Sequence, residues 1–70
     1  MTDLVNTYRV QAEKAQAEAD SATLANVRDR HLRAAFAWGQ MAERQERTER
    51  GRAQREDAAQ ARAALVAVHQ

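Results

Sequence analysis

The sequence has 70 residues, with no proline, no cysteine and only two glycines. Its length allows one domain at most, and the lack of cysteine excludes disulfides and cysteine-based zinc sites. Eleven basic residues offset ten acidic residues, and the net charge is +1. No strong field therefore directs the chain towards nucleic acid or an anionic membrane.

Large apolar side chains are scarce. Alanine accounts for 17 of the hydrophobic residues, and only 14 hydrophobic residues are larger than alanine. Burying one large side chain contributes about 1.5–3 kcal/mol, whereas ordering one residue costs about 1.5 kcal/mol. This deficit predicts that the chain gains stability from partners. We expect a homo-oligomer, either a dimer or a larger bundle, or docking on another protein.

The first predicted helix covers about residues 3–19. The composition favours helix throughout because Ala, Glu, Gln, Arg, Leu and Met dominate. An apolar stripe begins at Leu4, Val5 and Tyr8 and continues as alanines at positions 12, 15 and 19. A partner must approach closely along the alanine half. Asp20 and Ser21 are the best interior N-cap candidates, so we expect the chain to turn near residues 19–22.

The second predicted helix covers about residues 22–50 and carries the richest apolar face, which also includes His31. We expect Phe36, Trp38 and Leu32 to be the most buried side chains. Small residues around Gly39 form a notch that suits the close approach of a second helix, with packing inside the chain as the alternative. The candidate interface residues are Leu32, Ala35, Phe36, Trp38, Gly39 and Ala42.

Residues 43–57 contain five arginines, five acidic residues and one alanine. We expect a solvated helix supported by i,i+4 ion pairs such as Glu43–Arg47 and Glu46–Arg50. The alternative is that these charges are specificity pairs between chains. Gly51 is the strongest candidate for a break, because glycine costs about 1 kcal/mol inside a helix.

The third predicted helix covers about residues 52–69 and either is separate or continues the preceding helix. We therefore predict an all-α fold in which residues 1–70 form one unit. The first choice is a helical hairpin with a long second helix and Ala-rich packing that assembles into a bundle. The alternatives are a three-helix bundle with turns near residues 20 and 51, or one uninterrupted helix in a coiled coil.

The sequence lacks the motifs that carry catalysis. It contains no Gly-rich phosphate loop and no Ser–His–Asp set, and its two histidines have no carboxylates arranged around them as further metal ligands. We expect no enzymatic activity, no cofactor and no metal. The leading hypothesis is a non-enzymatic interaction or scaffold protein.

The alternative function is a nucleic-acid-associated accessory protein. On one continuous helix several arginines would share a side and could follow a phosphate backbone. Acidic residues in the same segment oppose this, so we rank nucleic acid below a protein partner. The candidate residues are Arg30, Arg33, Arg44, Arg47 and Arg55.

The apolar runs are too short for membrane insertion, which needs about 20 apolar residues. The longest runs are 34–38 and 63–68. The first residues show no basic segment followed by an apolar one, so we expect no signal peptide and a cytoplasmic location. The composition is typical of short bacterial proteins.

Overall fold

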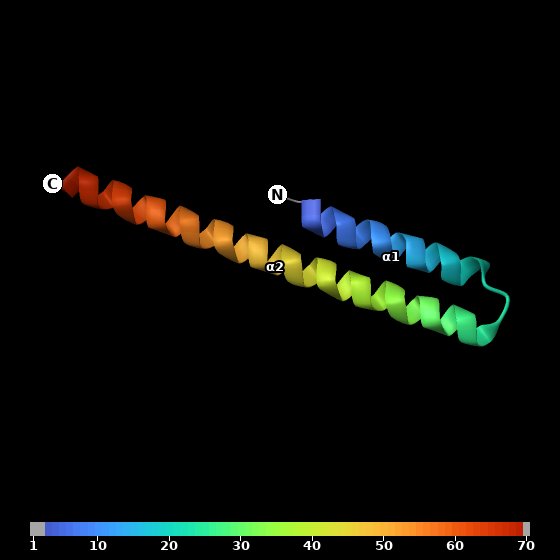
Figure 1. Cartoon of the computed structure of the whole chain (residues 1–70). Helices are drawn as coiled ribbons and strands as arrows, with labels where there is room; N and C mark the ends of the chain where they lie inside the picture. The colour runs from blue at the N-terminus through green and yellow to red at the C-terminus, as the bar shows by residue number, and fades with distance from the viewer. Residues whose placement is uncertain (1–2, 70) are drawn as a thin grey trace.

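The computed structural model describes residues 3–69, which form two helices, α1 (Asp3–Ser21) and α2 (Ala25–His69). α1 runs back along the first half of α2, and the rest of α2 continues alone past the start of α1 (Figure 1). The predicted all-α helical hairpin with a long second helix is confirmed. The single uninterrupted helix, the third choice from the sequence, is wrong.

Hydrogen bonds to backbone carbonyls fix the turn. The Ala22 amide donates to the carbonyl oxygen of Ala19 at 3.2 Å, and the Arg28 amide donates to that of Leu24 at 3.0 Å. Leu24 therefore occupies the N-cap position of α2, whose carbonyl accepts the first helical bond. The Arg28 guanidinium also reaches back to the carbonyl oxygen of Ala22 at 3.1 Å and bridges the turn.

The turn lies slightly later than the sequence predicts. Asp20 and Ser21 do not cap the second helix, because both belong to the last turn of α1. The Ser21 hydroxyl donates to the carbonyl oxygen of Glu18 at 3.2 Å, and the Asp20 carboxylate accepts from the Gln16 amide at 3.0 Å. Both side chains thus stabilise the end of a helix rather than the start of one.

Among residues 3–69, the buried core consists of one valine and three alanines. The core residues are Val5, Ala15, Ala19 and Ala42, and Ala19 and Ala42 are both 0% exposed. The prediction that Leu32, Phe36 and Trp38 would be the most buried side chains is wrong for the single chain. The reason is geometric, because a single partner helix covers only a fraction of a broad apolar arc, and α1 covers the fraction centred on the alanines.

α2 passes through Gly51 without a break. Gly51 has no positive φ angle, so it neither caps the helix nor turns the chain. The cost of one glycine, about 1 kcal/mol, is small beside the helix propensity of its neighbours. The alternative three-helix bundle with a second turn near residue 51 is therefore wrong, and residues 52–69 continue the preceding helix.

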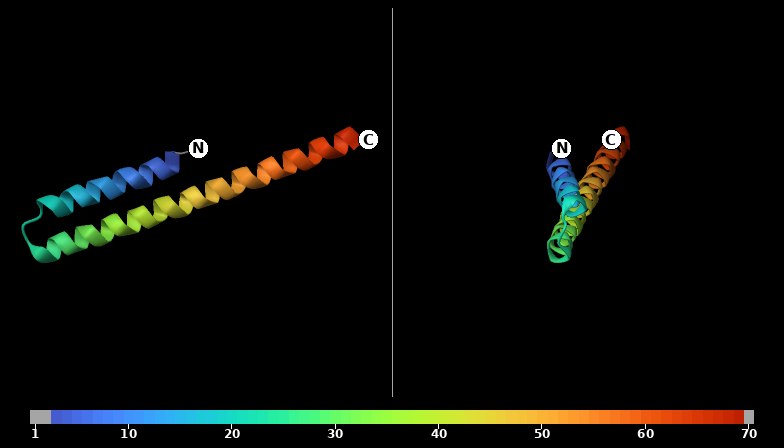
Figure 2. Two further views of the ribbon diagram at one scale, coloured as in Figure 1. Left: turned by 180° about the vertical axis from the view of Figure 1, so that it is seen from behind. Right: turned by 90° about the vertical axis from the view of Figure 1, so that its right-hand side faces the viewer.

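The chain is a long, narrow rod when it is seen from the side and is foreshortened when it is seen from near one end (Figure 2, left and right). Its extents are 70 × 15 × 10 Å and its radius of gyration is 19.7 Å, whereas a compact chain of this length would have a radius of about 11 Å. The α2 segment beyond α1 accounts for the difference. From Arg52 to His69 every residue is exposed, so this arm packs closely against nothing else in the described chain.

We predict that Ala42→Leu destabilises the hairpin. The Ala42 side chain is fully buried, so a larger side chain forces the helices apart at a cost of about 1–3 kcal/mol. Thermal unfolding followed by circular dichroism at fixed concentration measures the change. Ala37→Leu is the matched control, because Ala37 is exposed on the same helix. Equal melting temperatures for the two variants would contradict the assignment of Ala42 to the seam.

Candidate interaction surface

Within the part of the chain that the structure describes, an aromatic contact and an ion pair join α1 to α2 besides the alanine packing. The rings of Tyr8 and Trp38 lie 5.9 Å apart between centroids at an interplanar angle of 34°, a tilted arrangement that aromatic pairs favour. The Arg9 guanidinium contacts the Glu46 carboxylate at 2.7 Å. Because both charged side chains are partly solvated, the ion pair orients the helices more than it stabilises them.

The structure divides five of the six predicted interface residues into two groups. Ala42 is buried, and Ala35 and Trp38 are half-buried. Leu32 and Phe36 are exposed, at 39% and 68%. The first group therefore belongs to the seam within the chain, and the second remains free for contact with another molecule.

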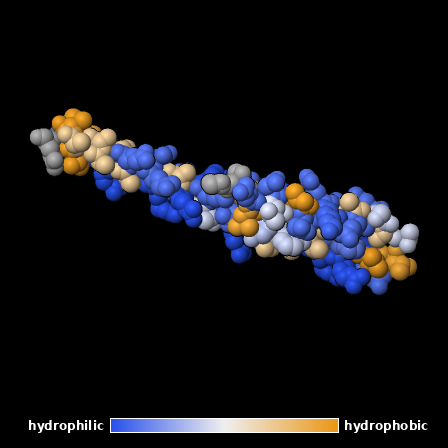
Figure 3. Space-filling model, turned by 45° about the horizontal axis from the view of Figure 1, so that its top comes forward, coloured by the Kyte–Doolittle hydropathy of each residue, from blue (hydrophilic) through white to orange (hydrophobic). Residues whose placement is uncertain are grey.

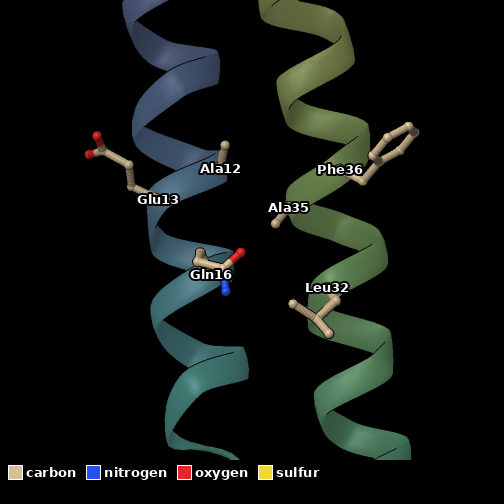
Figure 4. Close-up of a pocket in the computed structure, with 6 residues that line it drawn as sticks. All are labelled: Ala12, Glu13, Gln16, Leu32, Ala35 and Phe36. Carbon is tan, nitrogen blue, oxygen red and sulfur yellow. The ribbon is translucent and has the colours of Figure 1, made fainter.

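A shallow groove of about 420 Å³ runs along one side of the hairpin where the two helices meet. In Figure 4 the Ala35 methyl points towards α1, Leu32 lies over the space between the helices, and the Phe36 ring points away from α1. Exposed leucine and phenylalanine beside small residues form a surface that suits an apolar partner. The lining residues are Ala12, Glu13, Gln16, Leu32, Ala35 and Phe36.

Gly39 continues this surface by one turn of α2. It is half-buried, and a Cβ built there would meet nothing within 4 Å. The predicted notch thus has no helix seated in it within the chain. A side chain from another molecule has room at this position.

A second apolar patch lies near the C-terminal end of α2. Leu65 is 62% exposed and Val68 is 78% exposed, and Val66 between them is also exposed. Figure 3 shows hydrophobic atoms at both ends of the rod, separated by a mostly hydrophilic middle. The sequence interpretation placed no site residue here, although the run from Ala63 to Val68 is its longest apolar stretch.

The charges of residues 43–57 pair differently from the prediction. Among residues 3–69, the one ion pair within 4 Å joins Glu46 to Arg9 of α1. The predicted pairs Glu43–Arg47 and Glu46–Arg50 are therefore wrong in this conformation. Periodicity along one helix could not reveal the Arg9 contact, because it depends on how the hairpin closes.

The candidate nucleic-acid residues are all exposed on α2. The helix is continuous through Gly51, so the side shared by the arginines extends along α2 without interruption. Nearby acidic side chains share the segment and reduce its positive potential. The residues concerned are Arg30, Arg33, Arg44, Arg47 and Arg55.

The side chains of residues 3–69 offer no candidate metal centre. Across that range, no group of three or more His, Cys, Asp or Glu side chains is placed to hold a metal ion. His31 is half-buried on α2. Neither α1 nor α2 contains an apolar stretch of the length and hydrophobicity needed to cross a bilayer.

Comparison with protein-family models, curated proteins and solved structures finds no match for this chain. Its function must therefore be inferred from the exposed surfaces themselves.

We predict that Tyr8→Ala loosens the hairpin and shifts Trp38 fluorescence to longer wavelength. Trp38 is the only tryptophan, and its ring loses a partner worth about 0.5–1.5 kcal/mol beyond the buried area. Emission spectra and thermal melts measure the two effects. Val10→Ala removes an exposed apolar side chain from the same helix and should leave both unchanged. An unshifted Tyr8→Ala spectrum would argue against the ring contact.

Proposed function

We propose that this chain is a non-enzymatic interaction or scaffold protein that acts by self-association, its large apolar side chains contacting other copies of itself. The observation that carries the proposal is that small residues are buried while large apolar residues are exposed. Alanines fill the seam, whereas Phe36, Leu65 and Val68 are more than half exposed. Large apolar side chains exposed together on one molecule mark association surfaces.

The total exposed area supports the same conclusion. The single chain exposes 5664 Å², whereas a compact monomer of 7.9 kDa would expose about 4,400 Å². The excess is of the order that a specific protein interface removes from solvent. Association therefore offers this chain the burial that its own fold does not supply.

Docking on a larger protein through the same surface is the second form of the interaction hypothesis. The chain would then act as a small helical subunit in the cytoplasm. In that case the larger partner, rather than a second copy of the chain, would cover the apolar side chains of α2. It would do so with an apolar groove that accepts an amphipathic helix. Mixed apolar and charged character along α2 suits either arrangement.

Nucleic-acid binding is the alternative function, and the continuity of α2 through Gly51 favours it. An uninterrupted helix allows the arginines to follow one backbone over several turns. Their acidic neighbours weaken the attraction, so we rank this function below self-association. The two functions respond differently to salt, because phosphate binding falls steeply as the salt concentration rises.

We predict at least a dimer in sedimentation equilibrium at micromolar concentration. Association driven by apolar burial should persist between 50 and 500 mM salt, about the range over which phosphate binding collapses. A labelled duplex titrated under the same conditions provides the comparison. A cooperatively folded monomer of 7.9 kDa at every concentration would overturn the self-association proposal.

We also predict that Gly39→Leu weakens association without harming the helix. A Cβ added at Gly39 meets no atom within 4 Å, and leucine is a better helix former than glycine. Helicity should be equal or higher, while the dissociation constant rises by about tenfold or more. Gly39→Ala, which adds only a methyl group, should have a much smaller effect. Unchanged association of Gly39→Leu would exclude this position from the interface.

A further inference from the structure

One side of α2 carries a continuous row of exposed residues that α1 does not cover. At 3.6 residues per turn these positions fall within an arc of about 80°, centred about 90° round the helix from Ala35 and Ala42 in the seam. All are exposed except Gly39, which is half-buried. We call this row the lateral face: Leu32, Phe36, Gly39, Glu43, Arg47, Arg50, Gln54, Asp57, Ala61, Leu65 and Val68.

The lateral face is apolar at its two ends and polar in the middle. Leu32, Phe36 and Gly39 form one apolar end, and Leu65 and Val68 belong to the other. Glu43–Asp57 supplies the polar middle. When a second copy of the face is laid antiparallel against the first, apolar ends therefore meet apolar ends and the polar middles meet each other.

We propose that the lateral face binds a second copy of the chain with the two α2 helices antiparallel. The inference rests on the self-association proposed above and adds its surface, orientation and register. In this register Gly39 of one copy lies opposite Leu65 of the second copy, so the leucine side chain enters the open space at the glycine. Phe36 then lies opposite Val68, and each apolar end covers the other.

The charges select the antiparallel orientation. A parallel pair places each residue opposite its own counterpart, so Arg47 faces Arg47, Arg50 faces Arg50 and Asp57 faces Asp57. In the antiparallel register, positions advance in opposite directions from the Gly39–Leu65 layer, and Arg47 falls opposite Asp57. The two-fold symmetry makes this ion pair twice, and opposite charges across an interface fix register more than they add affinity.

The charges also disfavour one of the neighbouring antiparallel registers. Sliding the second copy by one heptad, so that Leu32 rather than Gly39 lies opposite Leu65, places Arg47 opposite Arg50. That arrangement brings two pairs of like charges together at the centre of the interface. The register with Gly39 opposite Leu65 has no such pair.

The size of the contact is sufficient for a specific dimer. The overlap from Phe36 to Val68 is about 50 Å long at 1.5 Å per residue, and a helix is about 10 Å wide. The footprint is therefore about 500 Å² per copy, which meets the total of about 1,000 Å² expected of a specific interface. Because α1 packs on a different side of α2, both hairpins remain intact.

Engineered disulfides test the arrangement, since the chain has no cysteine. Glu43 and Ala61 lie opposite each other at the centre line of the lateral face and anchor neither apolar end. Mixing Glu43→Cys chains with Ala61→Cys chains in a redox buffer should give at least tenfold more covalent dimer than either chain alone. Identical positions lie about 27 Å apart in the antiparallel dimer, whereas a disulfide needs Cα atoms within about 7 Å.

The controls separate this inference from the proposed function. Cross-linking of each single-cysteine chain with itself would indicate a parallel dimer. Preferential pairing of Glu43→Cys with Gln54→Cys would indicate the heptad-shifted register. Either result overturns the inference. A sedimentation dimer without the Glu43–Ala61 cross-link overturns it while leaving self-association standing. A monomer at every concentration overturns both proposals.

A charge swap gives an independent measurement that needs no cysteine. Arg47→Glu should raise the dissociation constant by about tenfold, because two attractive pairs become repulsive. Adding Asp57→Arg to the same chain should restore it to within about twofold. Arg44→Glu makes the same change of charge one turn earlier but off the lateral face, and it should have little effect. Failure of the double variant to recover, or an equal loss in Arg44→Glu, would overturn the Arg47–Asp57 pairing.

Discussion

The close approach of α1 and α2 depends on methyl side chains at the seam. Ala15, Ala19 and Ala42 are buried there, and no larger side chain than Val5 joins them. A single methyl allows two helices to come near each other but removes little apolar surface from water. The seam therefore sets the geometry of the hairpin while leaving most of the possible hydrophobic stabilisation unused. Tyr8 and Trp38 are half-buried beside the seam, whereas most of the other large apolar residues are exposed and need another molecule to bury them.

The side of α2 that forms the seam changes character where α1 begins. The seam side of α2 is lined by Ala35, Trp38 and Ala42, and after Gln45 the same side continues as Glu49, Arg52 and Glu56. A helix packed on these charged positions would lose their hydration without gaining apolar contact. The start of α1 lies at this transition, where Val5 shares a small groove with Glu46 and Glu49. The arm of α2 beyond α1 thus presents charged residues on the side that forms the seam nearer the turn.

Much of this fold could be predicted from the sequence, because its main determinants are local. The apolar stripe at Val5, Ala15 and Ala19 indicates both the first helix and the side that it buries. The predicted turn lies a few residues early, since Asp20 and Ser21 have capping chemistry that serves either end of a helix. Burial of Phe36 could not be judged from periodicity, which shows the width of an apolar arc but not how much of it a single helix covers. The apolar run around Leu65 can be recognised in the sequence, but the sequence does not show which surface of the folded chain it belongs to.

In the proposed dimer, the charged middle of the lateral face has a different role from its apolar ends. Leu65 and Phe36 provide surface whose burial is favourable in either orientation of a second chain, so they cannot choose between parallel and antiparallel pairing. Arg47 and Asp57 contribute little affinity where water remains nearby, but like charges at the same positions would oppose the wrong arrangement. Because the same helix supplies both halves of every pair, one substitution changes the interface at two places. A self-pairing helix can therefore gain orientational specificity from very few charges, and a chain with so small a core has little other means of obtaining it.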